Sequence, residues 1–368
     1  MEELFCIGCG AAIQTTDKKK PGFTPSSALE KGLEMGQVYC QRCFRLRHYN
    51  EISDVNISDD DFIKLLHEVG DSDALVVNVI DIFDFNGSVI PGLSRFVLGN
   101  DVLLVGNKKD ILPKSVKDGK VTQWLMERAH EVGLRPVDVV LTSAQNKLTI
   151  KNLMEKIESH RKGRDVYVVG VTNVGKSTLI NAIIQEITGD KDIITTSRFP
   201  GTTLDKIEIP LDDGSYLFDT PGIIHRHQMA HYLTAKNLKY ISPKKEIKPK
   251  TYQLNPEQTL FLAGLGRFDF IEGERQGFTA FFENTLELHR TKLAGANTFY
   301  QKHVGSLLVP PSSKEKRDFP ELIRHEFMIK EKTDVVFSGL GWIRVNEKAK
   351  IAAWAPKGVA VVLRKAII

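Results

Sequence analysis

The chain has 368 residues and a formal net charge of +4, and 42% of its residues are hydrophobic while 26% are charged. This length and composition predict a globular protein of two or three domains with a substantial core. No apolar run approaches the ~20 residues of a membrane-spanning helix, and the N-terminus MEELFCIGCG lacks the basic and apolar regions of a secretory signal. We therefore expect a cytoplasmic protein without a membrane-bound part.

The charge is unevenly distributed. Residues 241–368 contain 21 Lys and Arg against 14 Asp and Glu, a net charge of +7, whereas residues 1–50 carry +2 and residues 51–240 carry −5. The basic C-terminal third is therefore the candidate surface for a polyanionic partner. A second basic stretch with aromatic residues, 42–49, either contacts phosphates and bases or forms a solvated surface.

The four cysteines form two C-x-x-C pairs separated by thirty residues, namely Cys6/Cys9 and Cys40/Cys43. In a reducing compartment such pairs are more often metal ligands than disulfides, and four thiolates complete a closed tetrahedral Zn²⁺ shell. We predict a structural four-cysteine zinc finger in residues 1–50, with a redox dithiol as the alternative.

Strands and helices alternate from residue 73 onward. Apolar runs predict strands at 73–81, 101–110, 137–144 and 166–169, separated by helices around Val121–Val132 and Leu148–Ile157 and by a loop, IFDFNGS, at 82–88. This alternation predicts an α/β domain with a mostly parallel, doubly wound sheet, whose site lies at the carboxyl ends of the strands.

Two motifs at strand ends predict recognition of guanine. In N-K-K-D, the Asp110 carboxylate can accept both the ring N–H and the exocyclic amine of guanine, which adenine cannot match. Asn107 would brace this loop and the Lys108 stem would cover the face of the base. In T-S-A, Ser143 and Ala144 would bring backbone N–H groups to the guanine carbonyl oxygen. Alone, N-K-K-D is also an ordinary charged turn, but beside a phosphate loop and T-S-A it is specific.

The phosphate loop itself is G-x-x-x-x-G-K-S at 170–177, between a predicted strand and a predicted helix. Gly170 and Gly175 let consecutive backbone N–H groups curl around the β-phosphate, and Lys176 would reach the β- and γ-oxygens. Ser177 would offer its hydroxyl to Mg²⁺. The alternative is a chance Gly-rich turn. The predicted nucleotide-binding residues of the loop are Asn173, Val174, Gly175, Lys176, Ser177 and Thr178.

Two later motifs complete the γ-phosphate side. In FPGTTLD, Thr203 is favoured over Thr202 as the switch hydroxyl that closes on Mg²⁺ and the γ-phosphate. A hairpin then ends in D-T-P-G, where Asp219 would hold Mg²⁺ through water and the Gly222 N–H would meet the γ-phosphate. The predicted catalytic set is Lys176, Thr203, Asp219 and Gly222.

The order of these motifs is unusual, because N-K-x-D and T-S-A precede the phosphate loop instead of following D-x-x-G. Joining the old termini of a sheet and opening it elsewhere preserves its core, so this order indicates a circular permutation. With the C-x-x-C pairs and DIFDFNGS at 81–88, the chain resembles the YqeH family of circularly permuted GTPases, a bacterial ribosome-biogenesis group. The resemblance implies a zinc finger, a permuted GTPase domain, a C-terminal β-rich RNA-binding module and action on the small ribosomal subunit.

Catalysis looks incomplete in the sequence. Ile223 and Ile224 follow D-T-P-G, where many GTPases place a water-orienting Gln, so we expect slow intrinsic turnover that a partner or an ion stimulates. Asn173 resembles the residue that helps hold K⁺ in potassium-stimulated GTPases, and its alternative role is to shape the loop.

Because of the permutation, residues 225–240 connect D-x-x-G directly to the C-terminal third. We therefore expect loss of the γ-phosphate to change the conformation of this connecting segment. This segment contains three histidines, His225, His227 and His231, which are candidate metal ligands. The favoured interpretation is instead a solvated switch helix.

The C-terminal third begins with a basic, Pro-containing linker at 242–250. Residues 259–273 and 334–348 then resemble each other and share Gly-Leu-Gly at 264–266 and 339–341. This predicts two related β units with a more helical insert between them. The basic and aromatic residues suit RNA contact, although core packing explains most of the aromatics.

We therefore expect three domains, at 1–50, 51–240 and 241–368. The leading functional hypothesis is a GTP-hydrolysing ribosome assembly factor that uses GTP/GDP, Mg²⁺, Zn²⁺ and K⁺ and binds ribosomal RNA in a nucleotide-dependent way. The alternative is a GTP-gated protein-interaction switch without RNA contact. A metabolic enzyme is disfavoured, because the sequence has no second catalytic constellation.

Overall fold

The structure is a computed structural model that describes residues 4–6, 11–18, 20, 22–34, 38–41, 59–188, 207–222, 227–234 and 236–368. The chain divides into two compact units. Unit 1 comprises residues 1–82, 88–109 and 122–224, and unit 2 comprises residues 83–87, 110–121 and 225–368. Two short segments that follow strands of unit 1 thus belong to the same unit as the C-terminal third.

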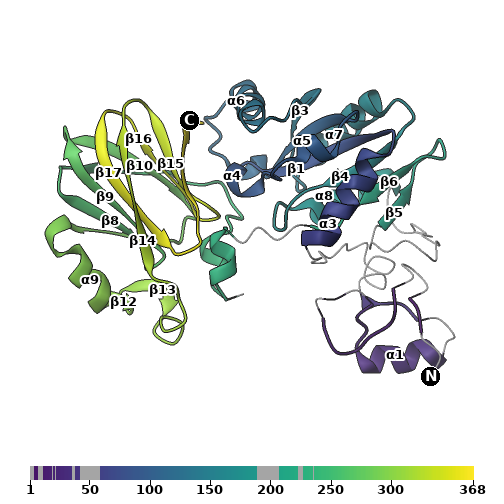
Figure 1. Cartoon of the computed structure of the whole chain (residues 1–368), viewed down its shortest axis with the longest axis horizontal. Coiled ribbons are helices and arrows are strands. Elements are labelled where there is room, and N and C mark those ends of the chain that lie inside the picture. Colours follow the sequence, from purple (N-terminus) through teal and green to yellow (C-terminus); the bar gives the residue numbers. More distant parts are fainter. Residues whose placement is uncertain are drawn as a thin grey trace. The chain divides into compact units, whose positions relative to one another are not determined.

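A six-stranded sheet with the order β3-β2-β1-β4-β6-β5 forms the centre of unit 1 (Figure 1). Its strands are β1 (Ala74–Asp81), β2 (Asp101–Asn107), β3 (Asp138–Leu141), β4 (Asp165–Val169), β5 (Ile207–Pro210) and β6 (Tyr216–Asp219). All neighbours pair in parallel except β5, which forms an antiparallel hairpin with β6. Every residue of β1 is buried, as expected for a parallel strand covered on both faces. The predicted mostly parallel sheet is confirmed.

The helices of the first 188 residues are α1 (Ser26–Glu34), α3 (Asp59–Gly70), α4 (Phe85–Ser88), α5 (Leu93–Phe96), the 3-10 helix η1 (Lys109–Ile111), α6 (Asp118–Glu131), α7 (Lys147–Arg161) and α8 (Lys176–Thr188). The α7 helix begins where Asn146 accepts a hydrogen bond from the Leu148 N–H at 3.0 Å, and it ends at Lys162 in a left-handed conformation. The loop predicted at 82–88 is wrong for its second half, because Asp84 accepts a hydrogen bond from the Gly87 N–H at 3.3 Å and starts the short helix α4.

Strand order fixes where a ligand can bind in unit 1. From the centre, β1, β2 and β3 extend to one side and β4 and β6 to the other, so the order reverses between β1 and β4. Open α/β sheets bind ligands at such a switch point, beyond the carboxyl ends of the strands. The loops that follow β1, β2, β4 and β6 all leave from that edge.

Unit 2 contains two five-stranded antiparallel sheets, which we name sheet A (β18-β15-β16-β10-β7) and sheet B (β11-β8-β9-β17-β14). The strands are β7 (Lys250–Leu254), β8 (Gln258–Leu262), β9 (Gly266–Gly273), β10 (Gln276–Phe282), β11 (Leu288–Lys292), β14 (Leu322–Ile329), β15 (Thr333–Phe337), β16 (Gly341–Val345), β17 (Ala349–Pro356) and β18 (Val361–Lys365). Apolar side chains of both sheets, such as Phe268, Phe278 and Ile343, form one buried core, so the sheets pack face to face.

The two sheets are internal repeats that have exchanged strands. Matching β7–β11 with β14–β18 in order converts the strand order of sheet A into that of sheet B. The Gly-Leu-Gly turns are also equivalent, because the Leu265 N–H donates to the Leu262 carbonyl at 3.0 Å and the Leu340 N–H donates to the Phe337 carbonyl at 2.9 Å. The predicted pair of related β units is confirmed.

The insert between the repeats contains η4 (Leu293–Gly295), α9 (Ala296–His303), β12 (Val304–Gly305) and β13 (Leu308–Ser312). Before β7, the described part of 225–240 is not the solvated helix predicted from the sequence but two 3-10 helices, η2 (Met229–Tyr232) and η3 (Leu238–Tyr240). Met229 is fully buried in the core of unit 2, and its N–H donates to the Ser338 carbonyl at 3.0 Å. This tertiary anchor replaces a continuous helix. No helix in the described ranges is both long and apolar enough to cross a membrane.

Candidate functional site

The phosphate loop lies between β4 and α8, and its two glycines are required by close contacts. A Cβ atom on Gly170 would lie 2.8 Å from the Val79 carbonyl oxygen. Gly175 has φ of +84°, and a Cβ atom there would lie 2.7 Å from Asn107 Nδ2. Helix α8 begins at Lys176, slightly earlier than the predicted start at Thr178. The loop therefore runs directly into a helix N-terminus, which favours an anion.

The N-K-x-D loop is hydrogen-bonded to the phosphate loop. Asn107 Nδ2 donates to the Val174 carbonyl oxygen at 2.9 Å, and Lys108 Nζ donates to the Asn173 carbonyl oxygen at 2.7 Å. Val174 is buried and Asn173 is exposed. Lys108 and Asn173 are 65 positions apart in the sequence. The two motifs that contain them therefore come together in one site.

The T-S-A motif joins the same cluster at the end of β3. The Lys109 N–H donates to the Thr142 carbonyl oxygen at 3.0 Å. Ser143 is buried and its own N–H donates to Thr149 Oγ1 at 3.1 Å, whereas Ala144 is partly exposed. Thr149 orients this turn and was not predicted from the sequence.

Asp110, the residue predicted to read guanine, is exposed and lies in η1, directly after Lys109. It is the first residue of its segment of unit 2. Its place in the chain thus directly follows the hydrogen-bonded cluster of Asn107, Lys108 and Lys109.

On the γ-phosphate side, Lys176 Nζ contacts the Asp219 carboxylate and the Thr220 carbonyl oxygen. Both charged side chains are only 2% exposed. Thr220 Oγ1 donates to the Val168 carbonyl oxygen at 2.8 Å, which fixes D-T-P-G beside the phosphate-loop strand. The structure therefore brings together the predicted catalytic residues Lys176 and Asp219.

The remaining predicted residues of this side differ in how far the structure describes them. Ser177 and Gly222 are buried, and a Cβ atom on Gly222 would lie 3.2 Å from the Thr172 side chain, while Thr178 is exposed. The other residues lie outside the described part of the chain: Thr202, Thr203, Ile223, Ile224 and His225.

The N-terminal cysteines are only partly described. Cys6 and Cys40 are each 2% exposed and pack together, and the Cys40 N–H donates to Cys6 Sγ at 3.1 Å. One cysteine of each C-x-x-C pair therefore reaches the other, although Cys9, Cys43 and the stretch 42–49 lie outside the described residues. Within the described residues, no group of three or more His, Cys, Asp or Glu side chains is arranged to hold a metal.

A second residue of the site, besides Thr149, was missed from the sequence. Asp81, the last residue of β1, forms an ion pair with Lys108, with 2.6 Å between Oδ2 and Nζ. Its position at the end of a buried strand, as the first residue of DIFDFNGS, was the available signal. The pairing itself joins two separate strands and cannot be read from local sequence.

Residues 83–87, within DIFDFNGS, belong to unit 2 and are held there by several contacts. The rings of Phe83 and Trp342 lie 5.3 Å apart. Gln228 Nε2 donates to Asp84 Oδ2 at 3.1 Å and to the Gly87 carbonyl oxygen at 2.7 Å. The DIFDFNGS motif thus contributes its first residue to the nucleotide-binding cluster and its middle residues to the β-rich unit.

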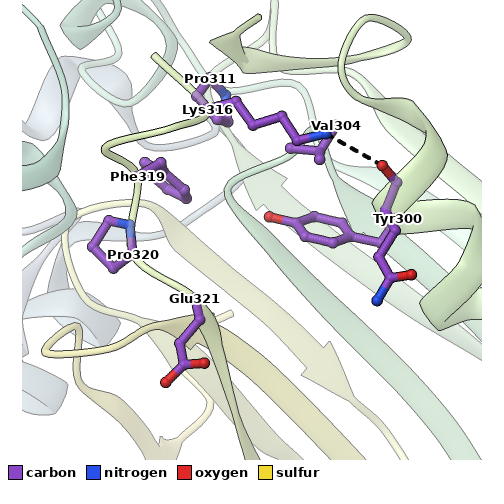
Figure 2. Close-up of a pocket in the computed structure, with 8 residues that line it drawn as sticks. Tyr300, Val304, Pro311, Lys316, Phe319, Pro320 and Glu321 are labelled. Atoms are coloured by element: carbon purple, nitrogen blue, oxygen red, sulfur yellow. Dashed lines mark hydrogen bonds between the residues drawn. The ribbon is translucent and has the colours of Figure 1, made fainter.

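Unit 2 also has a cavity of about 220 Å³, drawn in Figure 2, beside α9. Its walls include Tyr300 and Phe319, and Lys316 Nζ donates to the Gln301 carbonyl oxygen at 3.3 Å. Tyr300 donates its hydroxyl proton to the Gly264 carbonyl oxygen at 2.9 Å, and burial raises the pKa of Tyr300. All of the lining residues lie between positions 300 and 321, so none of the nucleotide-binding motifs contributes to this cavity.

Comparison with known protein families gives two matches. Residues 165–255 match the family described as 50S ribosome-binding GTPase, and residues 275–367 match the family described as YqeH-like, C-terminal. The first match contains the phosphate loop and D-T-P-G, and the second contains most of unit 2.

Similar proteins cover the whole chain. The Bacillus subtilis protein YqeH is 58% identical over 370 residues, covering 100% of both chains. The Arabidopsis thaliana NO-associated protein 1, chloroplastic/mitochondrial, is 30% identical, covering 96% of this chain and 71% of its own. Among solved structures, the GDP-bound structure of TM YlqF is 25% identical, covering 50% of this chain and 66% of its own with a TM-score of 0.32.

Proposed function

Because the chain belongs to the YqeH family of circularly permuted GTPases, we propose that it is a slow GTPase that acts as a ribosome assembly factor. The observation that carries the nucleotide part is the pair of hydrogen bonds from Asn107 and Lys108 to the phosphate loop. A loop that reads a base and a loop that holds phosphates must lie within the length of one nucleotide. These two loops touch each other.

The proposed roles follow from the position of each residue. At the base, Asp110 accepts the guanine ring N–H and exocyclic amine, and Ala144 offers its backbone N–H group. The Ser143 N–H, which was predicted for the same role, already donates to Thr149 Oγ1, so Ser143 supports the turn instead. At the phosphates, Lys176 exchanges its contact with Asp219 for the β- and γ-oxygens. Backbone N–H groups of the loop, including those of Gly175 and Lys176, surround the β-phosphate. Thr203 and Gly222 contact the γ-phosphate when it is present.

The donor set for Mg²⁺ fits the hard oxygen ligands that this ion prefers, because Ser177 carries a hydroxyl and Asp219 a carboxylate. Lys176, the residue before Ser177, contacts that carboxylate. The proposed holders are Ser177, Thr203 and, through water, Asp219. When bound with GTP, the ion neutralises charge that develops on the β- and γ-phosphate oxygens.

Slow turnover is proposed because Ile223 and Ile224 cannot orient a water molecule. Asn173 is exposed at the phosphate loop with a left-handed φ of 67°, so its side chain is available to a K⁺ ion near the phosphates. Hydrolysis measured in KCl and in NaCl tests this role. We expect faster turnover in KCl, and equal rates would leave Asn173 with the alternative role of shaping the loop.

The proposed zinc site uses Cys6, Cys9, Cys40 and Cys43. The N–H···S contact between Cys40 and Cys6 supports it, because backbone N–H groups commonly stabilise thiolates, and both sulfurs are buried together. We expect one zinc per chain by elemental analysis and loss of that zinc in Cys40→Ser. A folded, zinc-free Cys40→Ser protein and an equally zinc-free wild type would instead favour the redox dithiol.

The proposed partner is ribosomal RNA of the small subunit, bound by the basic unit 2. This part of the proposal rests on the charge of residues 241–368 and on the resemblance to the YqeH family. The GTPase family that matches residues 165–255 is described as 50S ribosome-binding, so the test must include both subunits. The test is sedimentation of the full chain with separated 30S and 50S subunits, with GTP, with GDP and at increasing salt. Salt-sensitive, nucleotide-dependent binding to 30S supports the proposal, because phosphate contacts weaken steeply with salt. Salt-insensitive binding that depends on ribosomal proteins favours the protein-interaction switch.

Nucleotide selectivity tests the core of the proposal. Calorimetric titration of the wild-type chain with GTP, GDP and ATP should give tight binding of the two guanine nucleotides and at least ~100-fold weaker binding of ATP, since a carboxylate selects the guanine edge. Equal affinities for ATP and GTP would contradict the proposed guanine site.

The proposed location is the cytoplasm. Its reducing conditions keep paired C-x-x-C thiols reduced, as the proposed zinc site requires.

A further inference from the structure

Asp81 lies where two structural features meet. It is the last residue of the central strand β1 and pairs in register with Asn107, the first residue of N-K-K-D. Its own N–H donates to the Ser88 hydroxyl at 3.1 Å, and Ser88 is fully buried. The backbone of Asp81 is therefore fixed at the switch point of the sheet by the strand pairing and by the Ser88 hydroxyl, and this fixes where its side chain begins.

The carboxylate contacts the lysine that would cover the base. Asp81 Oδ2 lies 2.6 Å from Lys108 Nζ, and the two side chains are 11% and 30% exposed. Lys108 Nζ also donates to the Asn173 carbonyl oxygen at 2.7 Å. Two of the three ammonium donors are thus used, one by a carboxylate and one by the phosphate loop.

This double contact determines what Lys108 presents to a ligand. Lys108 has φ of 62°, an uncommon conformation for a residue with a side chain, and both ends of its side chain are fixed. A lysine side chain has one of the largest rotamer entropies, and it loses this entropy when it is immobilised. The contacts with Asp81 and Asn173 order the Lys108 side chain independently of the base, and the paired charge leaves the methylene stem as the surface that meets the base.

We propose that Asp81 is a positioning residue of the guanine site, which acts by holding and neutralising Lys108. The inference rests on the proposed function, because it assumes that the N-K-x-D loop binds a guanine base. The base is common to GTP and GDP, so loss of Asp81 weakens both nucleotides by the same factor. The γ-phosphate is contacted elsewhere, so the chemical step is unchanged once the site is saturated.

The experiment compares the wild type with Asp81→Asn, which keeps the shape of the side chain and removes its charge. We expect about a tenfold loss of affinity for both GTP and GDP, the size of one charge-assisted hydrogen bond. The GTP-to-GDP affinity ratio stays constant, KM for GTP rises about tenfold and kcat stays within about twofold. The matched control is Asp138→Asn. Asp138 lies on β3 of the same sheet, and the substitution breaks its 2.7 Å ion pair with Lys156 of α7. This change should leave nucleotide affinity unchanged.

A double-mutant cycle shows whether Asp81 acts through Lys108. In the Lys108→Met background, Asp81→Asn should cause little further loss, because the group it positions is gone. Additive losses, a change in the GTP-to-GDP ratio, or unchanged affinity in Asp81→Asn would each overturn the inference. If Asp81→Asn does not fold, the guanine-nucleotide affinity of Lys108→Met is the test. Wild-type affinity in Lys108→Met would overturn the inference, because Lys108 would then contribute nothing that Asp81 could position.

The outcomes also separate this inference from the proposed function. A wild type that binds neither guanine nucleotide selectively contradicts the function itself. A selective wild type with an equally tight Asp81→Asn variant contradicts only the role of Asp81.

Discussion

The base end and the phosphate end of the nucleotide site differ in the contacts that their lysines make. At the base end, Asn107 and Lys108 already bridge to the phosphate loop, and Asp81 fixes the lysine. At the phosphate end, the catalytic lysine is instead committed to a protein carboxylate, in a pair of which each side chain is 2% exposed. A nucleotide can therefore leave the contacts of Lys108 in place, whereas in the proposed function Lys176 must exchange the Asp219 carboxylate for phosphate oxygens.

This difference separates two tasks. In the proposed function, guanine is recognised at the base end alone, so this recognition should be the same for GTP and GDP. In the proposed function, the distinction between GTP and GDP depends on Lys176, Asp219, Thr203 and Gly222. Variants at the two ends should therefore differ in the GTP-to-GDP affinity ratio.

The largest expected effect comes from Lys176→Ala at the phosphate end. Removing the lysine leaves the Asp219 carboxylate buried without its cation and removes the main positive charge for the phosphates. We expect kcat/KM for GTP to fall by at least about 100-fold and the free energy of unfolding to fall by about 3 kcal/mol. GTP affinity should fall more than GDP affinity, and hydrolysis assays, titration and chemical denaturation measure the three quantities.

The matched control for that variant is Lys151→Ala, which breaks an exposed ion pair between α7 and α8. Lys151 Nζ lies 3.2 Å from Glu186, and the lysine side chain is 59% exposed. We expect the free energy of unfolding to change by less than about 1 kcal/mol and the hydrolysis rate to match that of the wild type. If Lys176→Ala weakened GTP and GDP equally, the two ends of the site would not have separate tasks.

The next largest effect is expected for Asp110→Asn at the base end. An amide donates where the carboxylate accepts, so it suits the C2 carbonyl of xanthine and not the C2 amine of guanine. We expect GTP and GDP to bind about 100-fold more weakly and xanthosine triphosphate to bind more tightly than GTP. Competition titrations measure the exchange of preference, and Asp118→Asn, at a nearby exposed carboxylate, is the control. Retained guanine preference would remove Asp110 from the base site.

The sequence predicted the sheet of unit 1 because its signals are local. The run Ala74–Asp81 is β-branched and apolar throughout most of its length, and a strand buried on both faces suits it. The phosphate loop and N-K-x-D carry their chemistry within a few residues. The Gly-Leu-Gly turns likewise revealed the repeat in unit 2, because each turn closes with the same backbone hydrogen bond.

Apart from Thr149, which contacts Ser143 six residues away, the main misses depend on contacts between distant segments. The 225–240 stretch was expected to be a helix, but Met229 is buried in the core of unit 2 and its backbone binds Ser338. The segment after Asp81 was expected to be a loop, yet it packs in unit 2, where Phe83 meets Trp342. The Asp81–Lys108 pair joins adjacent strands and is invisible to any local pattern. Tertiary contacts decided each of these places.

The smallest expected effect concerns the hairpin that leads into the phosphate end. Hydrogen bonds from Ser215 and from Arg161, the latter at 2.8 Å, lower the pKa of Asp213 from 3.8 to about 2. A carboxyl whose pKa is lower in the folded state stabilises the fold above its unfolded pKa, and this contribution disappears as the pH falls through the folded value. The Tm difference between the wild type and Asp213→Asn should therefore be constant above pH 5, at about 2 °C or less, and should shrink between about pH 4 and pH 2.

The same variant tests how local the phosphate end is. Asp213 precedes β6, whereas Asp219 ends it, so the brace to Arg161 lies at the opposite end of the strand from the catalytic pair. We expect the hydrolysis rate of Asp213→Asn at neutral pH to stay within about twofold of the wild type, because surface ion pairs contribute little. A large loss of hydrolysis, or a Tm difference that grows as the pH falls, would mean that the position of Asp219 depends on the whole hairpin. The phosphate end would then extend well beyond Lys176 and its carboxylate, while the base end would remain confined to its three hydrogen-bonded loops.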